Sequence, residues 1–214
     1  MLAVVLAGGE NRRLPITKGF IKIGGRRLIE GLLAGLGGLF DSLAISTNEP
    51  EKYYYLGVPL VGDVYPVRGP MTGIFSALSF FNEGAFFIGC DMPFMSVELA
   101  ARLAQAGRDT GRGWDAIVPV WEGRAEPLFA FYSPRCLPAM EKCVLSGKTS
   151  LREFLTGART VRIDEDEVRG IDPEGLAFVN INTAADLEAA LALVPSPPTP
   201  LPVGEGGAKR RVRE

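Results

Sequence analysis

Hydrophobic residues in this chain form short continuous runs that alternate with segments of helical spacing. The runs have the length of strands that are buried on both faces of a parallel sheet. The segments between them place their apolar residues along one side of a helix. This alternation predicts an α/β fold with a mostly parallel central sheet, whose strands are joined by right-handed crossovers. The predicted strands are residues 2–6, 43–47, 85–89 and 116–120, and the predicted helices are residues 28–35, 71–81 and 97–106.

The second half of the chain is less regular. A strand is predicted over residues 126–132, after a turn at Glu122-Gly123, and a helix over residues 137–145. A short strand over residues 178–181 then leads into a last helix over residues 184–193.

The composition changes at Pro195. From there to the end the chain is rich in proline and glycine and finishes in a basic cluster. Such a segment cannot bury enough apolar area to fold. We therefore expect one domain, residues 1–194, followed by a disordered tail, residues 195–214.

The first predicted strand ends at a glycine pair, Gly8-Gly9, and several cations follow it. Glycines let the backbone approach phosphates without a Cβ in the way, and N–H groups after a buried strand commonly cradle phosphates. The spacing matches neither GxxxxGK[ST] nor GxGxxG. The segment therefore predicts a phosphate-binding loop of another kind, with a plain turn as the alternative. The cations are Arg12, Arg13, Lys18 and Lys22.

Polar residues also follow the later strands, at the sheet edge where ligands of α/β proteins bind. Asp91 lies at the end of the strand 85–89, two residues beyond it, and has two interpretations: a Mg²⁺ ligand, or the first residue of an Asx-turn before Pro93. Asn48 and Asp63 each follow a strand, where polar residues are expected in any case. The segment 69–73 starts a helix whose N–H groups either face an anion or simply begin after a Gly-Pro pair.

Asn180 and Asn182 lie just before the last predicted helix. Thr183 and Asp186 have the spacing of a capping box, and capping also accounts for Asn182. It does not account for Asn180, which lies inside the predicted strand.

Charge and cysteine usage exclude several classes of protein. The formal net charge is −2 over 214 residues, so a nucleic-acid-binding groove is not expected. The three cysteines lack paired zinc spacing, and Cys90 is expected to be a small buried filler. We see no secretory leader and no apolar run long enough for a membrane span, and therefore expect a cytoplasmic protein.

The chain contains no histidine. This excludes Ser-His-Asp and Cys-His catalysis and any metal site with a histidine ligand. Catalysis by this chain would have to use carboxylates, cations, backbone dipoles or a hard metal ion.

Taken together, the motifs resemble those of the molybdenum cofactor guanylyltransferases, which are nucleotidyltransferases with a Rossmann-like, three-layer fold. That family opens with LAGGxSxRMGxDK, and this chain departs from the pattern at Asn11, Pro15 and Thr17. The LPIT of residues 14–17 is similar to the RLxPxT of sugar-phosphate nucleotidyltransferases. The matching segments are LAGGENRRLPITK (6–18), GFIKIGGRRLIE (19–30), GPMTGI (69–74), CDMPF (90–94), EPLFAFY (126–132) and FVNINTAADL (178–187).

The resemblance implies roles for particular residues. Arg13, Lys18 and Asp91 would be the catalytic residues, with Arg13 and Lys18 on the phosphates and Asp91 on Mg²⁺. Asn180 and Asn182 would lie near the acceptor. The residues implied to contact the nucleotide or acceptor are Leu6, Ala7, Gly8, Gly9, Arg13, Lys18, Asn48, Asp63, Asp91, Asn180 and Asn182.

The activity implied is transfer of GMP from GTP to the terminal phosphate of molybdopterin, with release of pyrophosphate. LAGG, rather than the LAAG of cytidylyltransferase relatives, favours guanine. The alternatives are a sugar-1-phosphate nucleotidyltransferase, a molybdopterin cytidylyltransferase and a non-catalytic nucleotide-binding regulatory domain. The protein partners implied are other molybdenum-cofactor biosynthesis proteins and the molybdoenzymes that receive the product, with no nucleic acid and no membrane.

Overall fold

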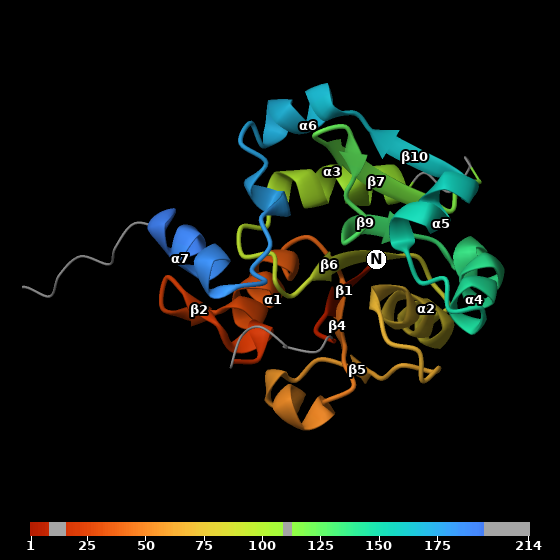
Figure 1. Cartoon of the computed structure of the whole chain (residues 1–214), viewed down its shortest axis with the longest axis horizontal. Helices are drawn as coiled ribbons and strands as arrows, with labels where there is room; N and C mark the ends of the chain where they lie inside the picture. Colours follow the sequence, from red (N-terminus) through yellow and green to blue (C-terminus); the bar gives the residue numbers. More distant parts are fainter. Residues whose placement is uncertain (9–15, 109–112, 195–214) are drawn as a thin grey trace, which may run out of the picture.

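The computed structural model describes residues 1–8, 16–108 and 113–194 (Figure 1). Its centre is an eight-stranded sheet of order β10-β7-β9-β6-β1-β4-β5, with β8 paired to β7. All neighbours on this path pair in parallel except β9, which is antiparallel to both β6 and β7. The strands are β1 Leu2–Leu6, β4 Ser42–Ser46, β5 Leu60–Val61, β6 Ala85–Gly89, β7 Ala116–Trp121, β8 Arg124–Ala125, β9 Phe129–Tyr132 and β10 Thr160–Ile163.

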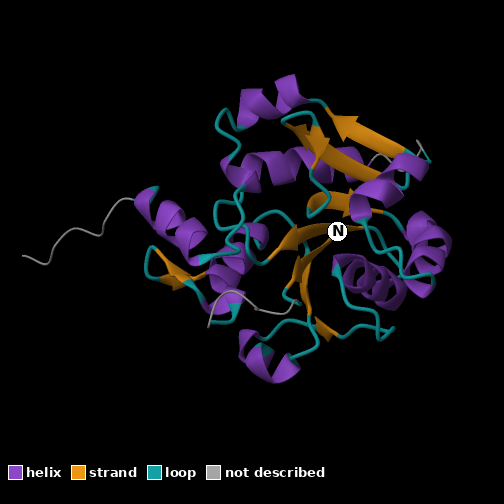
Figure 2. Ribbon diagram, viewed as in Figure 1, coloured by secondary structure: helices purple, strands orange, loops and turns teal. Residues whose placement is uncertain are grey.

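Helices cover both faces of the sheet and make three layers (Figures 1 and 2). One face packs against α1, α3 and α6, and the other against α2, α4 and α5. This confirms the predicted α/β fold with a mostly parallel sheet. The helices are α1 Leu28–Leu36, α2 Pro70–Phe81, α3 Val97–Arg108, α4 Leu137–Leu145, α5 Leu151–Gly157, α6 Glu165–Ile171 and α7 Ala184–Ala192.

The central strand β1 shows why this sequence folds into layers. All five of its residues are buried, and successive side chains of a strand point to opposite faces. Ala3 and Val5 therefore join the core under α1 and α3, while Leu2, Val4 and Leu6 join the core under α2. A strand covered on both faces must be apolar throughout, as this one is.

The strand order places a topological switch beside β1. From β1 the chain passes through α1 to β4 on one side, and later returns through α2 to β6 on the other side. Crossovers leaving in opposite directions open a crevice at the carboxyl ends of the two strands. The carboxyl ends of β1 and β6 are therefore where the fold places a ligand.

Two predicted strands need correction. Residues 178–181 form no strand: a 3₁₀ helix, Leu176–Phe178, is followed by irregular backbone. Asp172 accepts hydrogen bonds from the Leu176 and Ala177 N–H groups, and these bonds favour the turn over an extended chain. The strand predicted over residues 126–132 is only Phe129–Tyr132, because a turn in which Phe129 N donates to the Glu126 carbonyl comes first.

Several short elements were not predicted. A two-stranded hairpin, β2 Lys22–Ile23 and β3 Arg26–Arg27, turns at Gly24 and Gly25, both at positive φ. Such a glycine pair is a recognised hairpin turn. β10, α5 and α6 were also missed, each being seven residues or shorter, and β5 is the strand expected before Asp63, for which no bounds were predicted. The last helix, α7, forms as expected. No helix within the described ranges is long and apolar enough to cross a membrane.

Candidate active site

Four predicted site residues follow neighbouring strands of the sheet. Gly8 lies two residues beyond β1, Asn48 two beyond β4, Asp63 two beyond β5 and Asp91 two beyond β6. These strands run parallel and are adjacent in the order β6-β1-β4-β5. The four residues therefore lie along one edge of the sheet, as predicted from the carboxyl-end rule.

A cluster of three residues forms where β6 ends. Lys18 Nζ is 2.8 Å from Asp91 Oδ2 and 2.6 Å from Asn182 Oδ1. The side chains of Lys18 and Asp91 are only 22% and 17% exposed, so this ion pair is shielded from solvent more than a surface pair would be. Three segments far apart in the sequence thus meet at one ammonium group. Asp91 Oδ2 is therefore bound by a side chain.

Hydrogen bonds to the backbone of Asp91 and Asn182 hold in place the two residues whose side-chain oxygens accept from Lys18. Ile181 N donates to the Asp91 carbonyl at 2.9 Å and joins the irregular segment before α7 to the end of β6. Asp186 Oδ2 accepts from the N–H groups of Asn182 and Thr183 at 2.9 and 2.8 Å. These two bonds, Asn182 first, lower the pKa of the Asp186 carboxyl from its usual value.

The capping box predicted at Thr183 and Asp186 is confirmed. The side chain of Asn182 takes no part in it and instead accepts from Lys18. Asn180 does not lie in a strand; its Nδ2 donates to the Phe178 carbonyl at 2.8 Å. The structure therefore brings Asn182 to the Lys18–Asp91 cluster but gives Asn180 a local bond.

Asn48 and Asp63 form a second cluster by bonding each other twice. Asn48 Nδ2 donates to Asp63 Oδ2 at 2.6 Å, and Asp63 N donates to Asn48 Oδ1 at 2.8 Å. Partial burial raises the pKa of the Asp63 carboxyl, while the Asn48 hydrogen bond opposes the rise. This pairing joins the loops after β4 and β5 and presents polar groups beside the end of β1.

The end of β1 has main-chain groups with no hydrogen-bond partner among the described residues. Ala7 N donates to the Ser46 carbonyl at 2.9 Å, and the Leu6 carbonyl accepts from Cys90 N at 3.0 Å. Within the described part of the chain, nothing bonds the Ala7 carbonyl or the Gly8 N–H. Gly9 and Arg13 lie outside the described residues.

The N-terminus of α2 approaches this edge closely because of its glycines. A Cβ on Gly73 would be 2.7 Å from Ser46 Oγ and 3.3 Å from Leu6 Cδ2, so only glycine allows α2 to pack against the ends of β1 and β4. Gly69, the N-cap residue, has φ 145°, a conformation that favours glycine. The helix start predicted over residues 69–73 is thus present, with no side chain capping it.

Glycine also matters at Gly89, which the sequence did not single out. A Cβ on Gly89 would lie 2.7 Å from Asp91 Oδ1. The Asp91 carboxylate therefore folds back over the end of its own strand. In the sequence, the only indication of this role for Gly89 is its position two residues before Asp91, in the order Gly-Cys-Asp of residues 89–91. Cys90 itself is 7% exposed, so it is buried as expected, and burial raises the pKa of its thiol to about 12.

Glu126 and Arg152 form a further charged pair. Arg152 Nη2 lies 3.3 Å from Glu126 Oε1, and Arg152 Nε donates to the Ala125 carbonyl at 3.4 Å. Burial raises the pKa of the Glu126 carboxyl, and Arg152 opposes this rise. The pair fixes the turn that leads into β9.

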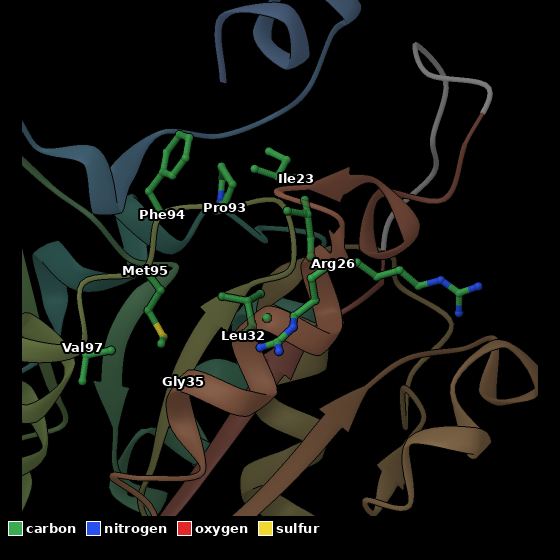
Figure 3. A pocket seen from close by; sticks show the side chains of 11 residues that line it. Ile23, Arg26, Leu32, Gly35, Pro93, Phe94, Met95 and Val97 are labelled. Atoms are coloured by element: carbon green, nitrogen blue, oxygen red, sulfur yellow. The ribbon is translucent and has the colours of Figure 1, made fainter. Parts of the chain in front are cut away.

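A separate pocket of about 300 Å³ lies between α1, the β2–β3 hairpin and the loop after Asp91 (Figure 3). Its lining is mostly apolar, including Leu32, Phe94 and Met95, and Arg26 reaches over α1 at its wall. None of the predicted site residues that the structure describes lines it. The pocket is therefore distinct from the row of polar groups at the sheet edge.

Oxygen donors suited to a hard metal ion are present at the Lys18–Asp91 cluster. Asp91 and Asn182 each direct a side-chain oxygen at the same positive charge, the Lys18 ammonium. A carboxylate and an amide carbonyl are ligands that Mg²⁺ accepts when substrate phosphates and water complete its shell. No group of three or more acidic, histidine or cysteine side chains lies together in the described ranges, so the protein alone would supply few ligands.

Comparison with known proteins identifies the class. The family described as "MobA-like NTP transferase domain" matches residues 3–163, which places the chain among NTP transferases. A probable molybdenum cofactor guanylyltransferase from Natranaerobius thermophilus is 34% identical over 194 residues, covering 88% of this chain and 93% of the relative. The molybdenum cofactor guanylyltransferase of Desulfosudis oleivorans is 32% identical and covers 89% and 94%.

A solved structure agrees with these relatives. Molybdopterin-guanine dinucleotide biosynthesis protein A from Archaeoglobus fulgidus superposes with a TM-score of 0.78 at 28% identity, covering 90% of this chain and 97% of that one. The chain therefore belongs to the MobA-like nucleotidyltransferases and, within them, to the molybdenum cofactor guanylyltransferase family. The resemblance drawn from the sequence motifs is confirmed.

Proposed function

We propose that the protein transfers GMP from GTP to the terminal phosphate of molybdopterin and releases pyrophosphate. The observation that carries the proposal is the Lys18–Asp91–Asn182 cluster at the β1/β6 switch point, in a chain of this family. The reaction forms a bond from an acceptor phosphate oxygen to the α-phosphorus of GTP and breaks the bond to the β-phosphate. We place it in the cytoplasm, with other cofactor-biosynthesis proteins and recipient molybdoenzymes as partners.

The nucleotide would lie across the ends of β1, β4 and β5. The backbone of Leu6, Ala7 and Gly8 would contact the nucleotide, and the Asn48–Asp63 pair would line the same pocket. A pocket built for guanine leaves buried polar groups without partners when cytosine is bound, which discriminates strongly. Gly9, Arg13 and Lys18 would hold the phosphates.

Asp91 would hold Mg²⁺, with the Asn182 oxygen beside it. Bound there, the ion would neutralise phosphate charge as it develops. Lys18 and Arg13 would contribute positive charge to the same phosphates, and the Asp91 carboxylate is held in position before the substrate arrives.

The reaction needs no general base, which is consistent with a chain that has no histidine. The second pKa of a phosphate monoester is near ~6, so the attacking oxygen is largely deprotonated at neutral pH. The task of the protein is then to hold two anions in line and stabilise the transition state. The acceptor would lie beyond the β6 end, near Gly69, Glu126 and Asn180.

Isotope placement tests the proposed reaction. The protein, Mg²⁺ and molybdopterin are incubated with GTP labelled either at the α- or at the γ-phosphate. We expect the α-label in molybdopterin guanine dinucleotide and the γ-label in pyrophosphate. Label in free phosphate alone would indicate a hydrolase, and no transfer of label would refute the proposal.

Asp91→Asn provides the matched variant for this assay. It keeps the size of the side chain and an oxygen for Lys18, but removes the charge that would hold Mg²⁺. We expect turnover to be abolished while the melting temperature stays within a few degrees of the wild-type value. Nearly full activity in this variant would show that Asp91 is only a turn residue.

A further inference from the structure

Lys18 occupies the carboxylate that the proposed function assigns to the metal ion. Its ammonium bonds Asp91 Oδ2 at 2.8 Å and Asn182 Oδ1 at 2.6 Å. The bond to Asp91 is within the normal N–H···O range, which begins at about 2.7 Å, and the bond to Asn182 is slightly shorter. One positive charge is therefore already seated between the two oxygens that suit a hard cation.

A metal ion and the Lys18 ammonium cannot both occupy this position. Two cations that share Asp91 Oδ2 would lie within a few ångströms of each other, in a place that solvent shields poorly, and would repel strongly. Lys18 gains another favourable partner when phosphates are present, because an ammonium binds a phosphate as a point charge.

We propose that Lys18 is a placeholder cation, which blocks metal binding at Asp91 until the phosphates of the nucleotide draw it away. The proposal rests on the assignment of Asp91 as the metal ligand. It couples the two ligands: the nucleotide raises the affinity for metal, and the metal raises the affinity for nucleotide by the same factor.

The oxygens that Lys18 leaves behind are held in place by other contacts. Gly89 gives the Asp91 carboxylate room, since a Cβ there would lie 2.7 Å from Asp91 Oδ1. Ile181 N anchors the Asp91 backbone. Asp186 fixes the backbone of Asn182. Removing the Lys18 charge should therefore expose a preformed pair of oxygens and leave the local structure intact.

Metal binding without nucleotide or acceptor tests this inference. Mn²⁺ serves as the probe, and electron paramagnetic resonance measures the free ion during titration of the wild type, Lys18→Met and the double variant Lys18→Met/Asp91→Asn. Lys22→Met, at an exposed lysine four residues away, is the matched control. We expect Lys18→Met to bind one Mn²⁺ about tenfold or more tighter than the wild type, since a repelling charge is removed.

The gain should disappear in the double variant, and Lys22→Met should bind like the wild type. Equal affinities of Lys18→Met and wild type, or a gain that survives Asp91→Asn, would overturn the inference. Thermal melting verifies that each variant is folded, and Lys18→Gln replaces Lys18→Met if that variant is not. Because the assay contains no GTP and no molybdopterin, its failure is distinguishable from failure of guanylyl transfer.

Discussion

Two lysines near the first strand differ in what they contact. Lys18 bonds Asp91 and Asn182, whereas Lys22 begins β2 and is exposed. Lys18→Ala should lower kcat/KM for GTP roughly 10- to 100-fold, since a charge-assisted hydrogen bond is worth about 1.5–3 kcal/mol. Lys22→Ala should change it far less. Steady-state kinetics with GTP decides, and equal losses at the two positions would show that Lys18 is not the phosphate contact.

Asp63 lies at the proposed nucleotide pocket, and its negative charge is unfavourable for the stability of the folded protein because the carboxylate is partly buried. Burial raises its pKa above the usual value, so the folded state favours the protonated carboxyl, and this contribution to stability is lost as pH rises through the raised pKa. Asp63→Asn should therefore melt about 1–3 °C above the wild type near neutral pH. The difference should vanish at about pH 4, near the ordinary pKa of aspartate.

Calorimetry at the two pH values tests this, with GTP binding measured on the same samples. The gain in stability should accompany weaker GTP binding, because the carboxylate is lost from the pocket. A variant less stable than the wild type at neutral pH would show that the Asn48 hydrogen bond outweighs the cost of burying the charge.

Single residues at the sheet edge could be predicted, but their contacts could not. Asp91, Asn48 and Asp63 were identified because each follows a strand. The two hydrogen bonds between Asn48 and Asp63 depend on the pairing of β4 with β5, and the sequence pattern does not predict which strands pair. The bond from Lys18 to Asn182 joins residues 164 positions apart, beyond the reach of any local pattern.

At the scale of elements, the start of α7 connects stability to the site. Thr183→Ala and Asp186→Ala both weaken the capping box and should each cost about 1 kcal/mol of stability, or about 2–4 °C. Only Asp186→Ala also removes the acceptor of the Asn182 N–H. We therefore expect Asp186→Ala to lose clearly more guanylyl transfer than Thr183→Ala at a similar melting temperature. Equal losses of activity would exclude a positioning role for Asp186.

Elements with a long apolar pattern were predicted well, and shorter ones were not. The buried strands β1 and β6 appear with their predicted bounds, and α1, α2 and α3 differ from prediction by at most two residues at an end. The strand predicted at 178–181 failed because a run of four residues, three of them apolar, was its only support. The Asp172 carboxylate accepts hydrogen bonds from the N–H groups of Leu176 and Ala177, and these bonds favour a turn just before residue 178.

At the scale of the whole molecule, the composition of residues 195–214 yields a simple expectation. These residues lie outside the described part of the chain, and the segment has few apolar side chains to bury. Deleting them should alter neither the melting temperature nor the rate of guanylyl transfer. A calorimetric scan of the truncated protein would contradict this if its melting temperature fell by several degrees.

The order of strands explains why the location of the site could be predicted before its geometry. Alternating strands and helices define a sheet with a switch point, and the switch point defines the ligand edge. The glycine-rich start of the chain then places its backbone there, at the end of β1. The residues between Gly8 and Ile16, which the motif makes central, lie outside the described structure, so the roles of Gly9 and Arg13 remain predictions from the sequence.

One measurement tests the central claim most directly. The protein is incubated with Mg²⁺, molybdopterin and an equimolar mixture of GTP, CTP, ATP and UTP, and the products are separated and identified by mass spectrometry. We predict that molybdopterin guanine dinucleotide and pyrophosphate dominate. A cytosine dinucleotide would move the chain to the cytidylyltransferases, and the absence of any dinucleotide while GTP still binds would contradict guanylyl transfer altogether.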